Sequence, residues 1–327
     1  MNISGFPNLL QQNLFDRTIT TTKQAATIAS QELVTGEKTD LARHLGGQAG
    51  EYNLITKALA DIETDKVRIG LADNRFAQID AALVNVRDTV NNYTEQVFVS
   101  LNTGGAFGVS EIQDTSRAYM SSLVLALNTS HAGRSLFAGD ETGAPALASV
   151  DTLLTDLETA IGGATDEATI ETAIAAYFAP GGDFETNFYQ GGTGQAADVK
   201  LPNGVDVAYD VKADNQVFRD LFEGFARMAF APDDASRAYI EDAYAQVSRG
   251  QNELTALQAN VGRERNLIGE ALETNQSEKL ILLESKNNLS GVDPYEAAAR
   301  MQRLQVQLEA AYTVTSRLTR LTLADYL

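Results

Sequence analysis

Few residues in this sequence have the types and spacings that support catalysis or metal binding. The two histidines, His44 and His131, lie far apart, and neither has acidic ligands nearby in a metal-binding pattern. The pair Asp140-Glu141 could act as a general acid and base, but adjacent carboxylates are expected by chance among 44 acidic residues. The absence of cysteine excludes disulfides, thiolate metal sites and cysteine nucleophiles. The sequence therefore predicts no catalytic, metal-binding or cofactor-binding residues and indicates that the protein is not an enzyme.

Two further motifs are better explained by structure than by chemistry. The cluster Gly191-Gly-Thr-Gly194 could hold a phosphate, but it lacks the lysine and hydroxyl residue of a P-loop, so we interpret it as a turn. The pair Asp233-Asp234 precedes an expected helix, where carboxylates cap the first turn and complement the helix dipole. Neither motif predicts a ligand site.

The charge of the chain is unevenly distributed. The formal net charge is −19, which argues against a nucleic-acid partner because phosphate binding needs a basic surface. Residues 140–242 hold 20 acidic and 5 basic side chains, whereas the rest of the chain holds 24 and 20. This pattern predicts a solvated, outward-facing middle segment and nearly neutral ends that pack against protein.

No targeting or membrane segment is evident. No stretch approaches the roughly 18 apolar residues of a membrane span. The first residues lack the basic region and long apolar run of a secretory signal. We therefore expect a protein that does not enter a membrane and is either cytoplasmic or exported without a cleaved signal peptide.

The strongest pattern is heptad spacing in two long segments. The first predicts a helix roughly 70 Å long over residues 52–97, and the second predicts a matching helix over residues 240–282. Asn275 falls on the second stripe, where a buried Asn can fix the register of a coiled coil. The apolar positions are Tyr52, Ile55, Leu59, Ile62, Ile69, Ala72, Phe76, Ile79, Leu83, Val86, Val90, Tyr93 and Val97 in the first, and Ile240, Val247, Leu254, Val261, Ile268 and Leu282 in the second.

The two ends of the chain carry thinner stripes with the same spacing. They are rich in Ala and Thr, so each stripe can hold one partner helix but would be marginal alone. We expect these ends to be mobile in a monomer and ordered in an assembly, with the stripes forming the contacts between copies. The predicted interface is Leu14, Thr18, Thr21, Ala25 and Ile28 in the N-terminal helix, and Met301, Leu304, Leu308, Ala311, Thr315, Leu318 and Leu321 in the C-terminal helix.

The segment between the long helices has a mixed pattern. A turn is expected at residues 103–108, and a weaker helix at residues 112–134 follows it. Glycines at 162–163 separate two short helices within residues 150–178, and those at 181–182 and 191–194 flank an apparent strand. The remaining elements expected are strands at 199–201 and 205–209, joined by a turn at 202–204, and a helix at 217–230.

These patterns predict a mainly α fold, in which the two halves of the chain form a long antiparallel helical rod or coiled coil with a small inserted α+β domain. A bundle whose helices pack only within one chain would show the same stripes. The predicted segments are a terminal assembly helix (1–45), half of the rod (46–137), the inserted outer domain (138–235), the other half of the rod (236–290) and a second assembly helix (291–327).

Several short motifs, in their order along the chain, resemble those of the flagellin family, and most closely those of hook–filament junction proteins (hook-associated protein 3). The resemblance covers nearly the whole length and departs from the family at residues 39–47, which favours a divergent branch. The motifs are Leu33-Val-Thr-Gly36, Ser135-Leu-Phe-Ala-Gly139, Tyr189-Gln-Gly-Gly192, Asp293-Pro-Tyr-Glu-Ala-Ala-Ala299 and the closing Ser316-Arg-Leu-Thr-Arg-Leu-Thr-Leu-Ala-Asp-Tyr-Leu327.

The resemblance implies a structural subunit of the bacterial flagellum that is exported unfolded and uncut by the flagellar type III apparatus. Its expected partners are other copies of itself in a ring or helical assembly, a neighbouring hook-associated protein, flagellin and an export chaperone. The alternatives are a flagellin that forms the filament itself, a helical scaffold whose middle domain binds a ligand or carries an enzyme, and a self-contained coiled-coil adaptor.

Overall fold

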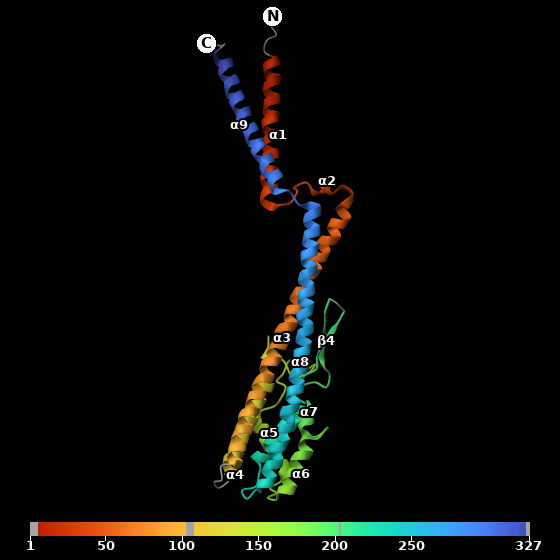
Figure 1. The fold of residues 1–327 in the computed structure, drawn as a ribbon, viewed down its shortest axis with the longest axis vertical. Helices are drawn as coiled ribbons and strands as arrows, with labels where there is room; N and C mark the ends of the chain where they lie inside the picture. The colour runs from red at the N-terminus through yellow and green to blue at the C-terminus, as the bar shows by residue number, and fades with distance from the viewer. Residues whose placement is uncertain (1–5, 103–107, 203, 325–327) are drawn as a thin grey trace. The chain divides into compact units, whose positions relative to one another are not determined.

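A computed structural model describes residues 6–102, 108–202 and 204–324 of the chain (Figure 1). The chain forms two compact units, one of residues 1–64 with 276–327 and one of residues 65–275. Two long helices, α3 (Ala49–Asn102) and α8 (Arg237–Ser290), contribute to both units. Long helices dominate and the sheets of the described part are two-stranded, which confirms the predicted mainly α fold with a small α+β insertion.

The first unit contains the helices from both ends of the chain. They are α1 (Phe6–Thr35) and α9 (Pro294–Ala324), and the short α2 (Leu41–Leu45) and a 3-10 turn (Gly46–Gln48) connect α1 to α3. The helix α1 ends directly before Gly36, which has a φ of 72°, and α9 begins directly after Asp293. The Asp293 carboxylate accepts a 2.8 Å hydrogen bond from the Tyr295 N–H, and proline is favoured at the first position of a helix because it has no N–H to satisfy.

In the second unit α3 and α8 run antiparallel. Arg265 on α8 pairs with Asp80 on α3 at 3.0 Å, and Gln251 donates a hydrogen bond to Asn91 further along both helices. The heptad prediction is confirmed, because the stripe on α3 from Ile69 to Val97 and the stripe on α8 from Ile240 to Ile268 are buried. Asn275 is buried as well, on the same stripe.

The helix predicted over residues 112–134 is shorter than expected. It is α4 (Val109–Leu127), and a hairpin of β1 (Ser130–His131) and β2 (Arg134–Ser135) follows it. The helix ends because the Asn128 side chain bonds both the N–H and the C=O of Leu147, at 2.8 and 2.9 Å, and fixes the chain in another direction. Most of the turn predicted at residues 103–108 lies outside the described residues.

The inserted segment forms most of its predicted elements. They are α5 (Val150–Ile161), α6 (Glu167–Phe178), the antiparallel pair β3 (Ala196–Lys200) and β4 (Asp206–Tyr209), and α7 (Gln216–Ala229). Of the predicted hairpin turn, residue 203 lies outside the described part. The apparent strand between the glycine pairs is wrong, because Phe184–Phe188 forms a single π-helical turn whose two phenylalanines pack against Phe222.

The predicted cap at Asp233-Asp234 is also wrong. The hydroxyl of Ser236 accepts the hydrogen bond from the Tyr239 N–H at 3.1 Å, so Ser236 caps α8. The two aspartates lie in the preceding turn. A serine directly before the first helical residue is a more specific capping signal than two aspartates that end two residues earlier.

Candidate assembly surface

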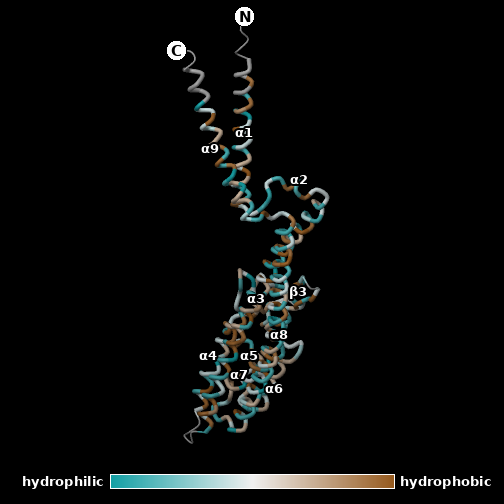
Figure 2. The backbone as a smooth tube through the Cα atoms, turned by 45° about the horizontal axis from the view of Figure 1, so that its top comes forward, coloured by the Kyte–Doolittle hydropathy of each residue, from teal (hydrophilic) through white to brown (hydrophobic). Residues whose placement is uncertain are grey.

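The helices from the two chain ends, α1 and α9, pack side by side and antiparallel (Figure 1). Ala29 on α1 and Ala297 on α9 are buried, and Glu32 on α1 is buried beside Arg300 on α9, with 3.4 Å between the charged groups. Small alanines allow the two backbones to approach closely. Figure 2 shows residues of mixed hydropathy along both helices, as expected for a narrow contact rather than a broad apolar face.

The predicted residues of the C-terminal helix lie on the stripe that α1 partly covers. Met301, Leu304, Leu308, Ala311 and Thr315 are all half-buried, whereas most residues between them are exposed. The side chains of Leu318 and Leu321 lie outside the described part of the chain. The stripe on α9 therefore contributes to pairing within one molecule.

The predicted residues of the N-terminal helix lie mostly on an exposed face of α1 next to the face that its partner covers. Leu14 is 55% exposed, Ile28 is 39% exposed, and Thr18 and Thr21 are exposed, so that only Ala25 is half-buried. The face covered by α9 is displaced by one residue and consists of Phe15, Ile19, Thr22, Ala26 and Ala29. Both sets keep three-four spacing, and only the small size of Ala26 and Ala29 could have indicated the inner one.

The threonines of α1 have already satisfied their hydroxyl donors. Thr18 donates to the Leu14 carbonyl at 2.8 Å, Thr21 to the Arg17 carbonyl at 3.0 Å and Thr22 to the Thr18 carbonyl at 2.7 Å. Such bonds to the preceding turn are common for threonine in helices. Burial of this face by another protein would therefore leave no hydroxyl donor unpaired, which removes the usual penalty for burying polar groups.

A groove of about 550 Å³ lies between α1 and α9. Val34, which is 83% exposed, and Met301 and Leu308 provide its apolar lining, and the small residues Ala26 and Ser30 leave room between them. Its lining is largely apolar and its mouth is open. Its shape and composition suit the side of an amphipathic helix.

The two connections that lead into the terminal helices are joined to each other. The Lys38 N–H donates to the Ser290 carbonyl and the Val292 N–H to the Gly36 carbonyl, both at 2.9 Å. Glu37 lies opposite Gly291 in an antiparallel bridge. A Cβ added to Gly291 would lie 2.3 Å from the Asn287 carbonyl oxygen, so this position requires glycine. The corner is therefore a small hydrogen-bonded structure rather than two independent linkers.

Side chains reinforce this corner. The Lys286 ammonium lies 2.7 Å from the Glu37 carboxylate and 5.8 Å from the centre of the Tyr52 ring. The hydrogen bond to Glu37 raises the pKa of Lys286, although partial burial opposes this. Glu32 accepts a hydrogen bond from the Thr39 N–H at 3.3 Å, so one buried carboxylate contacts both α9 and the first connection.

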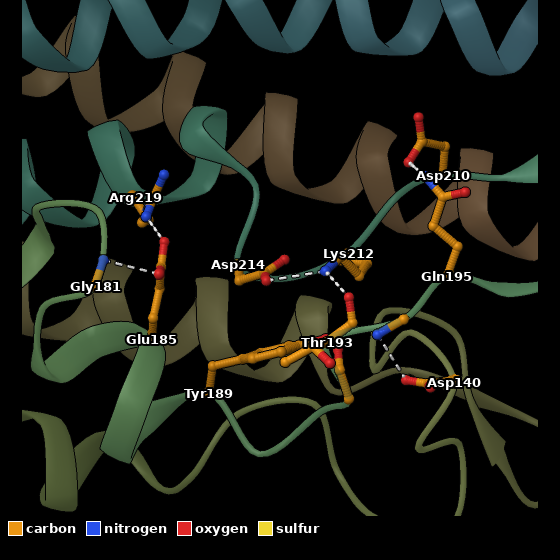
Figure 3. A network of polar contacts seen from close by, with 12 residues as sticks. Asp140, Gly181, Glu185, Tyr189, Thr193, Gln195, Asp210, Lys212, Asp214 and Arg219 are labelled. Atoms are coloured by element: carbon orange, nitrogen blue, oxygen red, sulfur yellow. Dashed lines mark hydrogen bonds and ion pairs between the residues drawn. The ribbon is translucent and has the colours of Figure 1, made fainter.

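Asp140, one of the two adjacent carboxylates in the inserted segment, holds two of its loops together (Figure 3). The Asp140 carboxylate accepts a 3.1 Å hydrogen bond from the Gly194 N–H, and a Cβ on Gly192 or Gly194 would collide with it. This confirms that the Gly191–Gly194 cluster is a turn. In the same network Lys212 lies 3.1 Å from Asp214 and donates to the Thr193 carbonyl at 3.3 Å.

The described residues contain no group of three or more His, Asp and Glu side chains that could hold a metal ion. His44 is exposed on α2, and His131 is half-buried on β1. Within the same part of the chain, no helix is long and apolar enough to cross a lipid bilayer.

The fold defines a class of helical subunit in which both chain ends form one helix pair and the middle of the chain forms a separate insertion. Residues 239–327 match the family described as the bacterial flagellin C-terminal helical region. The resemblance to flagellins is therefore confirmed over this part of the chain, which is similar to the C-terminal region of flagellins. No curated protein sequence matches the chain.

Two solved structures align with the chain. A flagellar hook-associated protein from Vibrio parahaemolyticus aligns with a TM-score of 0.53 at 12% identity, over 74% of this chain and 97% of its own. FlgL from Bacillus cereus aligns with a TM-score of 0.47 at 16% identity, over 74% of this chain and 99% of its own. The alignment with the Vibrio parahaemolyticus protein covers more of the chain than residues 239–327. At 12% identity it shows a similar fold and nothing about function.

Proposed function

We propose that this protein is a structural, non-enzymatic subunit of the bacterial flagellum that joins the hook to the filament. The observation that carries the proposal is the pairing of α1 with a C-terminal helix of the flagellin type. The fold shared with a hook-associated protein of Vibrio parahaemolyticus supports the junction over other positions in the flagellum. The acidic insertion then faces solvent and the nearly neutral ends face other subunits.

The contacts between copies use the surfaces of α1 and α9 that the monomer leaves open. On α1 these are Leu14, Thr18, Thr21 and Ile28, whose apolar atoms and satisfied hydroxyls can be buried at low cost. On α9 the predicted stripe serves the same assembly by holding α1 in place, and Met301 and Leu308 line the groove beside it. A ring or helical array of copies then extends this packing from molecule to molecule.

The expected neighbours are a hook-associated protein on one side and flagellin on the other. Export through the flagellar type III apparatus, without a cleaved signal peptide and with the help of a chaperone, places the protein outside the cell. The matched family region favours one alternative of the same class, a flagellin that forms the filament itself. The number of copies per flagellum separates these two functions, because a junction needs about one ring of subunits and a filament needs thousands.

Deletion of residues 301–327 tests the assembly role. This change removes most of α9 but none of the residues of the unit formed by residues 65–275. The truncated protein should keep the cooperative unfolding of that unit and fail to enter flagella in cells. Normal incorporation of the truncated protein would refute the proposal.

A further inference from the structure

Two sides of α1 are open in the monomer, in addition to the face that α9 covers. On the first side lies the outer stripe, which we define as Leu14, Thr18, Thr21, Ala25 and Ile28. On the second side α1 contributes to the groove of about 550 Å³ beside α9, with the residues Lys23, Ala26, Thr27, Ser30, Gln31 and Val34. Most of the stripe is exposed, and Val34 in the groove is 83% exposed, so neither surface is fully used within one molecule.

A constant spacing relates the outer stripe to the groove. Nine residues of an α-helix make about two and a half turns, so side chains nine positions apart point to opposite sides of the helix. Four stripe residues are each followed nine positions later by a residue that lines the groove, in the pairs Leu14 and Lys23, Thr18 and Thr27, Thr21 and Ser30, and Ala25 and Val34. The helix therefore carries a row of side chains on one side and half of a groove on the other, along overlapping stretches.

Both surfaces are suited to burial against another copy of this chain. In the groove the Thr27 hydroxyl donates to the Lys23 carbonyl at 3.0 Å, just as the stripe threonines donate to the turn before them, so burial leaves no hydroxyl donor of these threonines unpaired. The outer stripe has no charged residue, and Lys23 is the one charged residue among those that line the groove. Copies with a net charge of −19 repel each other, so surfaces without acidic groups are where they approach at least cost.

We propose that the outer stripe of one copy occupies the groove between α1 and α9 of the next copy. The inference rests on the proposed assembly of copies and specifies which surface meets which. Side chains at three-four spacing on one helix face fit an apolar groove between two other helices. Because the stripe and the groove lie on opposite sides of α1, this contact is head-to-tail, and every pair of copies keeps one free stripe and one free groove. Association then continues until a ring closes or a helical array forms, whereas a symmetric dimer would stop at two copies.

Disulfide cross-linking of the purified full-length protein tests this contact, because the chain has no cysteine of its own. Thr18→Cys marks the stripe and Thr27→Cys marks the groove, and both positions are exposed. Within one molecule the two sulfurs cannot meet, because nine residues span about 13.5 Å along the helix axis and the side chains point apart. Under mild oxidation the double variant should form a ladder of cross-linked species. An equimolar mixture of the two single variants should form dimers and nothing longer, with roughly tenfold more dimer than either variant alone, because the contact raises the effective concentration of the two thiols.

Matched charge substitutions in the double-cysteine protein provide the control. Val34→Glu places a carboxylate in the groove and should abolish the ladder, whereas Val306→Glu adds the same charge at an exposed valine of α9 outside the groove and should retain it. As much dimer from Thr18→Cys alone as from the mixture would show a symmetric contact between two stripes and overturn the proposal. A double-cysteine protein that forms no more cross-links than its Val34→Glu form would overturn it as well, and would assign the groove to a different protein. The cross-linking is done in solution and does not depend on where the protein is located in cells, so its failure is distinguishable from failure of the proposed function.

Discussion

The inner and outer faces of α1 are separated by a single residue in the sequence, and a pair of neighbouring substitutions can therefore distinguish their roles. Ala29 is fully buried against α9, whereas the adjacent Ile28 is 39% exposed. Ala29→Leu adds three carbons where the helices meet, and overpacking of this kind costs about 1–3 kcal/mol. Ile28→Ser leaves the inner face unchanged and removes apolar surface from the outer face.

The two variants should fail in different ways. A fully buried isoleucine contributes roughly 1.5–3 kcal/mol, so covering the exposed 39% of Ile28 contributes about 1 kcal/mol per contact between copies. Ala29→Leu should reduce the protection of α1 amides in millisecond hydrogen exchange of the monomer by roughly five-fold or more, because 1 kcal/mol corresponds to about that factor. Ile28→Ser should leave this protection unchanged and reduce incorporation into flagella.

The control is Val306→Ser, which removes an exposed apolar side chain from α9 on a face that does not contact α1. It should leave the exchange of α1 amides unchanged, as Ile28→Ser does. The assignment of the two faces would be refuted if Ile28→Ser reduced protection in the monomer as much as Ala29→Leu, or if Ala29→Leu left protection unchanged.

Three further predictions concern the unit formed by residues 65–275. Ala132→Gly should increase the free energy of unfolding by about 0.5–1 kcal/mol in urea titrations, because glycine adopts a φ of 51° without strain; a decrease would contradict the strained turn. Gly224→Ala should destabilise the protein by about 1–3 kcal/mol in the same assay, because its Cβ would lie 2.5 Å from the Val247 side chain, whereas Gly262→Ala, which meets no atom, should not. Burial, and then the negative charge of Asp220, raise the pKa of Glu253. The contribution of Glu253 to stability is therefore fully present below its unfolded pKa and is lost as the pH rises through its folded pKa. Glu253→Gln should be more stable than the wild type at pH 7 but not near pH 4, and equal stability of the two proteins at both pH values would contradict this account.

Elements with a strong periodic signal could be predicted from the sequence. The stripes of α3 and α8 repeat over many turns, so one misplaced residue does not change the predicted face. Asp293 indicates the start of α9, and the glycines at 162–163 indicate the end of α5. These signals depend on local chemistry, which a single sequence contains.

Features that depend on contacts distant in sequence were missed. The early end of α4 depends on Asn128 bonding to Leu147, and the π-helical turn depends on packing of Phe184 and Phe188 against Phe222. The hydrogen bonds between residues 36–38 and residues 290–292 join segments about 250 positions apart. No local sequence pattern predicts them. On α1, two overlapping stripes satisfied the same periodicity, so only the partner helix decides which one is covered.

The location of the protein on intact flagella tests the central claim most directly. Gold-labelled antibodies raised against the acidic segment of residues 140–242 would be applied to isolated flagella and viewed by electron microscopy. The junction function predicts label at the boundary between hook and filament and nowhere else. Label along the whole filament would show a flagellin. Absence of label from the flagella of cells that produce the protein would contradict the proposed flagellar function.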